Sequence, residues 1–143
     1  LDTNLVAPAL LTRHFAGAPG AAAIVNILDR RVAGLDVGAV PYSVSKKALE
    51  DVTRLSALAL APAIRVNAVA PGTIATELAA KAVLTSDDAR KKIMSRTPMK
   101  RLGEPSEIAD VVAWLASDAA SYVTGEIVTV DGGRMTLNYT VPV

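Results

Sequence analysis

The sequence predicts an α/β fold with a doubly wound parallel sheet, of which this chain supplies the C-terminal half. Three short apolar segments, at 21–28, 64–70 and 126–130, have the length and composition of strands. Longer helical segments separate these strands. Residues 21–70 run through a strand, a loop, a helix and a second strand, which is a βαβ unit with a right-handed crossover.

The first half of the chain predicts two helices around one strand. Residues 5–15 are apolar on most faces and indicate a buried helix that ends near Phe15, before a Gly/Pro cluster at 17–20. Residues 21–28 are continuously apolar, which is typical of a central strand covered on both faces. A long helix is expected at 42–61, closed by Pro62. Its apolar stripe is predicted at Val44, Ala48, Val52, Leu55 and Ala59.

The second half predicts two more strands and two more helices. Pro71 and Gly72 end the strand at 64–70, and a charge-bearing helical stretch follows at 76–95. We interpret its basic row as a solvated face rather than a phosphate site. The next helix begins at Pro105, and Trp114 on it is interpreted as a core or interface aromatic. The basic row is Arg90, Lys91, Lys92 and Arg96, and the apolar face of the later helix is Ile108, Val111, Val112 and Leu115.

Composition limits the classes of protein. The 143 residues fit one domain, and a chain that is 51% hydrophobic and 20% charged can fold. The formal net charge of +1 predicts neither nucleic-acid binding nor attachment to an anionic membrane by bulk charge. The absence of cysteine excludes disulfides and thiolate chemistry, and no His, Asp and Glu cluster has metal-ligand spacing. No apolar stretch is long enough to span a bilayer, so we expect a soluble cytoplasmic protein.

A nucleotide-binding α/β sheet should open with a strand and a glycine-rich turn into a helix. None of the nine glycines forms G-x-G-x-x-G or a P-loop. A strand that is apolar on both faces also needs neighbours at both edges. We therefore expect that a preceding segment completes the sheet.

Tyr42 and Lys46 form the first candidate catalytic pair. They lie four residues apart at the start of the long helix, so both side chains lie on one face. An ammonium near a phenol favours the phenolate, which lowers the tyrosine pKa from about 10 and makes Tyr42 a plausible general acid. The spacing alone also occurs by chance, as a surface tyrosine beside a lysine.

The setting of this pair favours the catalytic interpretation. Open α/β sheets bind ligands beyond the carboxyl ends of their strands, and Asp29, Tyr42 and Pro71 all follow strands there. Asp29 could instead cap its loop, and Asn4 could be a helix N-cap.

The sequence also resembles the short-chain dehydrogenase/reductase family. The motifs that carry this resemblance are collinear over almost the whole chain. They are Asn4 in TNL, Ala23–Ile27 (AIVNI), Tyr42 to Lys46 (YSVSK), 64–72 (IRVNAVAPG), 101–105 (RLGEP), 123–126 (VTGE) and 130–133 (VDGG).

This resemblance implies a Rossmann-like fold and a nicotinamide cofactor, NADPH or NADH. It implies that Tyr42 donates the proton, that Lys46 holds the nicotinamide ribose and lowers the tyrosine pKa, and that Asn4 supports Lys46 through a water. It also implies a set of cofactor-lining residues, with Thr76 supplying a hydroxyl donor. These residues are Pro71, Gly72, Ile74 and Thr76.

One position departs from the family pattern. Most members have a catalytic serine thirteen residues before the tyrosine, where this chain has Asp29. An ionised carboxylate only accepts hydrogen bonds, so it suits a substrate with N–H donors. The pteridine reductase branch is similar here, which implies NADPH-dependent reduction of a pterin or folate. The nucleotide half of the family is absent from these residues, so NADP rather than NAD rests on this similarity alone.

Two alternatives stay open. One is carbonyl or alcohol oxidoreduction within the same family. The other is a truncated, non-catalytic assembly module. For either enzyme we expect a small-molecule substrate and a homodimer or homotetramer, with residues 1–143 as the C-terminal part of one domain.

Overall fold

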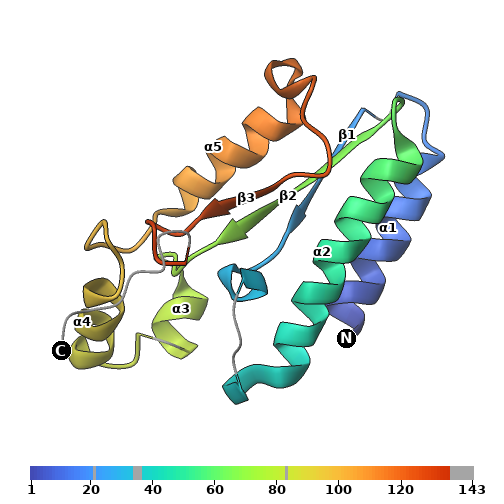
Figure 1. The fold of residues 1–143 in the computed structure, drawn as a ribbon. Helices are drawn as coiled ribbons and strands as arrows, with labels where there is room; N and C mark the ends of the chain where they lie inside the picture. The colour runs from blue at the N-terminus through green and yellow to red at the C-terminus, as the bar shows by residue number, and fades with distance from the viewer. Residues whose placement is uncertain (21, 34–36, 83, 136–143) are drawn as a thin grey trace.

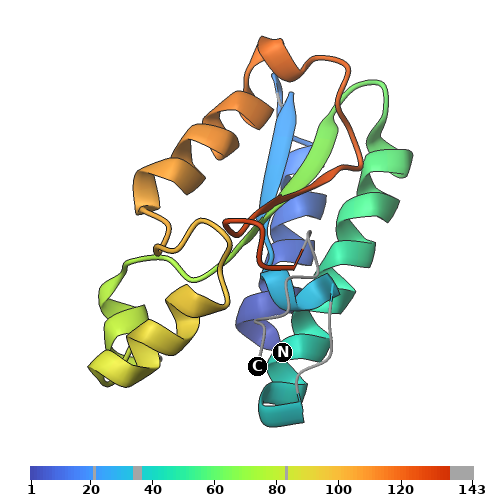
Figure 2. The ribbon, with the colours of Figure 1, turned by 60° about the vertical axis from the view of Figure 1, so that its left-hand side comes forward.

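The computed structural model describes residues 1–135 except 21, 34–36 and 83. A parallel sheet lies between two helical layers, with α1 and α2 on one face and α5 on the other, and the two views agree on this arrangement (Figure 1, Figure 2). The strands are β1 (Ala23–Ile27), β2 (Arg65–Pro71) and β3 (Ile127–Val130). The main helices are α1 (Ala7–Ala16), α2 (Val40–Leu60), α3 (Glu77–Ala82), α4 (Asp87–Ser95) and α5 (Pro105–Ala116).

The predicted parallel α/β fold is confirmed, with strand order β1-β2-β3. Ala23 pairs with Arg65, and Val69 pairs with Val128. Among the described residues β1 pairs with β2 alone and lies at the edge, so the expectation that 21–28 is a central strand depends on the preceding segment and stays a prediction. Ala21 itself lies outside the described residues. β2 is the central strand, since its residues 66–70 are all buried.

The buried face of α2 differs from the predicted stripe. Val44 and Leu55 are 52% and 66% exposed, whereas Leu49, Thr53 and Ala57 are buried against the sheet. The prediction counted apolar residues only, but Thr53 is buried with its polar group satisfied. Its hydroxyl donates to the Leu49 carbonyl at 2.8 Å and accepts from Asn26 Nδ2 at 3.0 Å. Replacing Leu49 with alanine in this position should cost about 2–5 kcal/mol.

α1 is not the buried helix that the sequence predicted. Thr12 is its one buried residue, while Leu10, Leu11 and Phe15 are exposed. The helix packs against α2 on one side, and its opposite side faces away from the described residues (Figure 1). The end of the helix near Phe15 is as predicted, since Gly17 is its C-cap.

The predicted helix at 76–95 is two helices, α3 and α4. Ser86 begins the second helix, because its Oγ accepts the backbone N–H of Ala89 at 3.1 Å and caps the first turn. The four basic residues of the row at 90–96 are exposed, as expected of a solvated face.

α5 and β3 confirm the remaining predictions. Pro105 is the first residue of α5, and Leu115 is fully buried on its predicted face, but Trp114 is 43% exposed and is not a core residue. Arg65 on β2 holds the end of this helix, since its guanidinium donates to the carbonyls of Leu115 and Ser117 at 2.8 and 3.0 Å.

Candidate active site

Asp29 and Tyr42 meet at the carboxyl end of β1. Asp29 follows the strand directly, and Tyr42 lies in the first turn of α2. The Tyr42 hydroxyl donates to Asp29 Oδ2 at 3.0 Å. Oδ1 of the same carboxylate accepts the backbone N–H of Arg31 at 2.8 Å. Asp29 therefore caps its loop and also contacts Tyr42, and its catalytic role stays a prediction.

The pKa of Tyr42 is raised to about 12. Burial of the phenol is the largest cause, and the charge of Asp29 and its hydrogen bond add to it, because each disfavours the phenolate. The positive charge of Arg31 opposes this shift. Tyr42 is therefore protonated at neutral pH.

Lys46 lies one helical turn after Tyr42, and it is buried. Its Nζ donates to the Ile27 carbonyl at the end of β1 at 2.7 Å, and it lies 5.9 Å from the Tyr42 ring centroid. Burial lowers the pKa of Lys46, and Asp29 partly offsets this. Lys46 is not among the groups that shift the Tyr42 pKa, which differs from the expected lowering. Burial and Asp29, which accepts the hydrogen bond of the hydroxyl, set the direction of the shift.

Asn4 lies in a short π-helical turn, Asp2–Val6, that packs against α2. Its side chain is partly buried. Asn4 is not an N-cap, because Leu1 occupies the N-cap position of this turn and Val6 occupies that of α1. Its support of Lys46 through a water stays a prediction.

The second wall of the site is the loop after β2. A cavity of about 400 Å³ lies between Asp29 and Tyr42 on one side and this loop on the other. The predicted residues Gly72, Ile74 and Thr76 line it. Thr76 Oγ1 accepts the backbone N–H of Ala79 at 3.1 Å, so its hydroxyl hydrogen is still able to donate. Pro71 is the last residue of β2, next to this wall.

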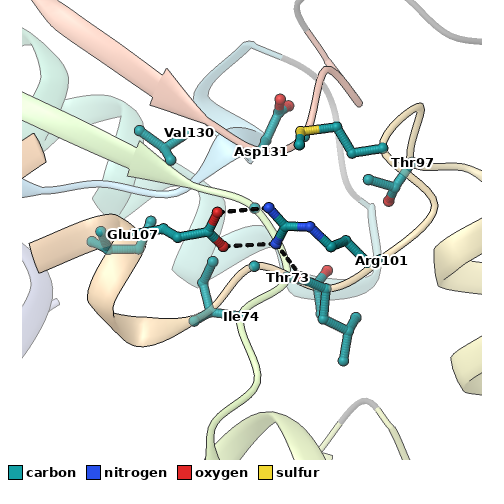
Figure 3. A pocket seen from close by; sticks show the side chains of 13 residues that line it. Thr73, Ile74, Thr97, Arg101, Glu107, Val130 and Asp131 are labelled. Carbon is teal, nitrogen blue, oxygen red and sulfur yellow. Dashed lines mark hydrogen bonds and ion pairs between the residues drawn. The ribbon is translucent and has the colours of Figure 1, made fainter. Parts of the chain in front are cut away.

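A second chain segment fixes that loop from behind. Gly103 donates its N–H to the Thr73 carbonyl at 3.1 Å and accepts the N–H of Ala75 at 2.8 Å. Arg101 and Glu107 form a bidentate ion pair with both N···O distances 2.7 Å (Figure 3). They line a small cavity of about 70 Å³, which Asp29 and Tyr42 do not line. The ion pair therefore belongs to the support of the loop rather than to the chemistry.

The arginines next to Asp29 were not predicted as site residues. Arg30 and Arg31 line the same cavity as Tyr42, and the Arg31 guanidinium lies 5.6 Å from the Tyr42 ring centroid. Their position directly after Asp29 was the available signal. Thr73 also lines this cavity and was not singled out, although it lies between two residues that were.

The site residues fit the nicotinamide end of a dinucleotide. Hydroxyls, an ammonium and a glycine-containing loop are donors and surfaces suited to a ribose and an amide ring. Gly72 has no room for a side chain, since an added Cβ would lie 2.7 Å from Asp131 Cα. The backbone of the loop at Gly72 therefore packs closely against the backbone of Asp131. Among the described residues, no group of three or more His, Asp or Glu side chains could hold a metal ion.

Comparison with known proteins finds oxidoreductases among the proteins that this chain resembles. A protein-family model described as enoyl-(acyl carrier protein) reductase matches residues 1–135. An uncharacterized oxidoreductase of Mycobacterium tuberculosis is 40% identical over 124 residues, which cover 87% of this chain and 47% of that protein. A short-chain type dehydrogenase/reductase structure from Mycobacterium ulcerans matches with a TM-score of 0.88 and 32% identity, over 94% of this chain and 50% of that one.

A solved 4-hydroxyisoleucine dehydrogenase complexed with NADH also matches, with a TM-score of 0.88 and 32% identity over 94% of this chain and 57% of that chain. The fold is thus Rossmann-like, with a parallel sheet. The chain belongs to the short-chain dehydrogenase/reductase family. It spans about half the length of the curated relatives it matches. None of the helices among the described residues is both long and apolar enough to cross a bilayer.

Proposed function

We propose that this chain supplies the catalytic half of an NAD(P)-dependent oxidoreductase that interconverts a carbonyl and an alcohol. The observation that carries this proposal is the Tyr42 hydroxyl at 3.0 Å from Asp29, with Lys46 one turn away and the 72–76 loop across the cavity. Open α/β folds bind their ligands at the carboxyl edge of the parallel sheet, and Tyr42 lies at this edge. The 4-hydroxyisoleucine dehydrogenase relative supports carbonyl and alcohol chemistry.

Tyr42 is the group that moves the proton. With a pKa of about 12 it carries its proton at neutral pH, so it is suited to protonate an oxygen that gains negative charge during reduction. Its proton points at Asp29 in this structure and must turn toward the substrate oxygen on binding. Asp29 therefore competes with substrate for the Tyr42 proton.

A nicotinamide, when bound, exchanges hydride with the substrate carbon. Lys46 and Tyr42 would hold the nicotinamide ribose, and Gly72, Ile74 and Thr76 would line the ring and the adjoining phosphates, with Pro71 shaping the loop. The NADH complex of the 4-hydroxyisoleucine dehydrogenase supports this class of cofactor. Which of NADH and NADPH is used is open, and our proposal of NADPH depends on the pterin hypothesis below.

A second candidate is the reduction of a C=N bond in a pterin or folate. Asp29 favours it, because a carboxylate with both oxygens accepting hydrogen bonds suits a ring that offers N–H donors. In this reaction Tyr42 and Asp29 would together manage the protons. The named relatives do not include such an enzyme, so it ranks behind carbonyl reduction.

We further propose how the chain occurs in the whole protein. Residues 1–143 would be the C-terminal part of one Rossmann-like domain in the cytoplasm, in a homodimer or homotetramer. The open edge of β1 and the exposed apolar side chains of α1 and α2 support this, because such surfaces are normally covered. These side chains are Leu10, Leu11, Phe15, Leu55 and Leu58.

Substrate assays on the protein at its natural length test the proposal. Oxidation of NADH and of NADPH is followed with a ketone, a keto acid and a dihydropterin, in the wild type and in Asp29→Ala and Asp29→Ser. Carbonyl reduction that survives in Asp29→Ser supports the first function. Dihydropterin reduction that is lost in Asp29→Ala supports the second.

Cofactor binding separates an enzyme from the assembly module. A ligand that binds the folded state alone raises the unfolding temperature, so NADH or NADPH should stabilise the protein. If NADH and NADPH cause no thermal shift and none of these substrates is turned over, both proposed functions are overturned and the assembly module remains.

A further inference from the structure

Arginine side chains from separate segments gather at one end of the candidate active site. Arg30 and Arg31 line the cavity that contains Tyr42, and Arg134 follows the Asp131–Gly133 turn after β3. Arg134 interacts electrostatically with Arg30 and Arg31, and also with Arg96 after α4. Like charges brought together by the fold repel one another, which is unfavourable unless a negative group joins them.

Arg30 reaches the turn that carries Arg134. Its Nη1 donates to Met135 Sδ at 3.9 Å, across 105 residues of sequence. Figure 2 shows this proximity, with the segment after β3 passing beside the short helix Arg30–Ala33. A thioether is a weak acceptor and carries no charge, so this contact does not compensate the positive charge of Arg30.

Arg134 has an unused donor inside the protein. Its Nη1 is buried and has no hydrogen-bond partner among the residues that the structure describes. Burial is the largest cause that lowers the pKa of Arg134, and the positive charges of Arg30 and Arg96 lower it further. The carboxylate of Asp131 opposes this shift. A buried, unpaired guanidinium donor is unfavourable, and such groups in native proteins commonly serve a ligand.

Asp131 does not supply the missing partner. Its Oδ1 accepts the backbone N–H groups of Gly133 and Arg134 at 2.8 and 3.0 Å, and its Oδ2 accepts that of Met135 at 2.7 Å. The carboxylate is committed to the turn that follows β3. The guanidinium of Arg134 therefore keeps a donor for a group that enters from outside.

We propose that Arg30, which lines the cavity of Asp29 and Tyr42, and Arg134, which lies near Arg30 outside the lining of that cavity, bind an oxyanion of the substrate, a carboxylate or a phosphate. The planar guanidinium presents paired donors that match such an oxyanion. The anion would fill the unused donor and relieve the repulsion among the arginines. This inference rests on the proposed function, since it places the substrate in the cavity where Tyr42 donates its proton.

The substrate is favoured over the cofactor as the source of this anion. Arg30 lies on the wall of Asp29 and Tyr42, across the cavity from the 72–76 loop that we propose for the cofactor. Lys46, the proposed ribose ligand, lines a different cavity together with Ile27. A cofactor phosphate has the same chemistry, so the experiment separates the two.

The test compares binding of 4-oxopentanoate and its neutral methyl ester to the protein at its natural length, by calorimetry. The variants are Arg30→Gln, Arg134→Gln and, as a matched control, Arg90→Gln, an exposed arginine of α4. We expect the wild type to bind the carboxylate more tightly than the ester. Arg30→Gln and Arg134→Gln should each weaken carboxylate binding about tenfold, the effect of one charged hydrogen bond, with ester binding unchanged.

Stability gives a second readout. Arg134→Gln removes a half-buried charge that lies near other arginines, so its unfolding temperature should rise without ligand, and Arg90→Gln should not change it. Addition of 4-oxopentanoate should raise the unfolding temperature of the wild type and of Arg90→Gln more than that of Arg134→Gln. If Arg134→Gln does not fold, Arg30→Gln and Arg30→Lys carry the same comparison.

Three results would overturn the proposal. They are equal binding of 4-oxopentanoate and its ester by the wild type, equal effects of all three glutamine variants, or weakened affinity for NADH or NADPH with carboxylate binding unchanged. The last result would assign the arginines to the cofactor. A protein that binds the carboxylate but transfers no hydride would instead overturn the proposed function and keep this site.

Discussion

The two walls of the 400 Å³ cavity are built on different principles. The wall formed by the end of β1 and the start of α2 presents ionisable side chains, Asp29 and Tyr42, that bond each other directly. The wall formed by the 72–76 loop presents backbone and small groups, pinned from behind by Gly103. In the proposed function the first wall would carry the proton-transfer groups, and the second would set the shape of the cavity. Changes to the first should alter proton transfer at nearly constant fold, and changes to the second should alter geometry.

The largest expected effect comes from removing the acid of the first wall. Tyr42→Phe deletes the hydroxyl and keeps the ring, so kcat should fall about 10²–10⁴-fold, the usual contribution of a general acid. Stability should change by only about 1 kcal/mol, because one partly exposed hydrogen bond to Asp29 is lost. Steady-state kinetics and thermal unfolding are measured together. Unchanged kcat in a folded Tyr42→Phe protein would remove Tyr42 from the mechanism.

The next effect tests the shape of the second wall. In Gly72→Ala the new Cβ would lie 2.7 Å from Asp131 Cα, and backbone cannot give way cheaply. We expect about 1–3 kcal/mol of destabilisation and a lower kcat/KM. Gly103→Ala is the matched control, because its Cβ would lie 2.7 Å from Ile74 Cδ1, the mobile end of a side chain. Chemical denaturation should rank Gly72→Ala as clearly the worse. Equal losses would show that the loop does not depend on its contact with Asp131.

A third prediction concerns the pKa of Tyr42. Asp29→Asn removes a charge that raises it, so the pKa should fall from about 12 while burial still holds it above 10. A folded-state pKa above the unfolded value stabilises the protein below pH 10, and this contribution is lost as pH rises toward 12. The ring carbon shift of labelled Tyr42 in NMR follows the titration. Asp51→Asn, an exposed change elsewhere on α2, should leave it unmoved. An unchanged titration in Asp29→Asn would mean that burial alone sets this pKa.

Local pattern was enough for most of the fold. Strand positions and the start of α5 at Pro105 follow from apolar runs and turn residues near in sequence. The face of α2 was mispredicted because Thr53 is buried only with Asn26, 27 residues away, to satisfy it. A count of apolar residues cannot include a buried threonine whose partner comes from another element. The neighbours of β1 could not be predicted for a similar reason, since apolar composition does not reveal which strands lie side by side.

The site divides in the same way. Asp29 and Tyr42 were predicted together because residues after parallel strands meet at one sheet edge, and the 3.0 Å contact confirms their proximity. The raised Tyr42 pKa was not predicted, because it depends on the burial of the phenol and on the hydrogen bond from its hydroxyl to Asp29. Arg134 comes 104 residues after Arg30, so no spacing rule could join them. Only the parallel order of the strands brings them to the same end of the molecule.

The smallest expected effect lies behind the second wall, at the Arg101–Glu107 ion pair. Hydrogen bonds from Arg101 and from the Glu104 backbone lower the pKa of Glu107 to about 2. A lowered folded-state pKa stabilises the protein above the ordinary carboxyl range, and the contribution is lost as pH falls toward 2. Glu107→Gln should therefore lower the unfolding temperature slightly at neutral pH and match the wild type near pH 2, since exposed pairs contribute little. Glu77→Gln, in a looser exposed pair with Lys81 at 3.8 Å, should show less of this pH dependence. A gap between wild type and Glu107→Gln that persists at pH 2 would mean that packing rather than charge holds the loop.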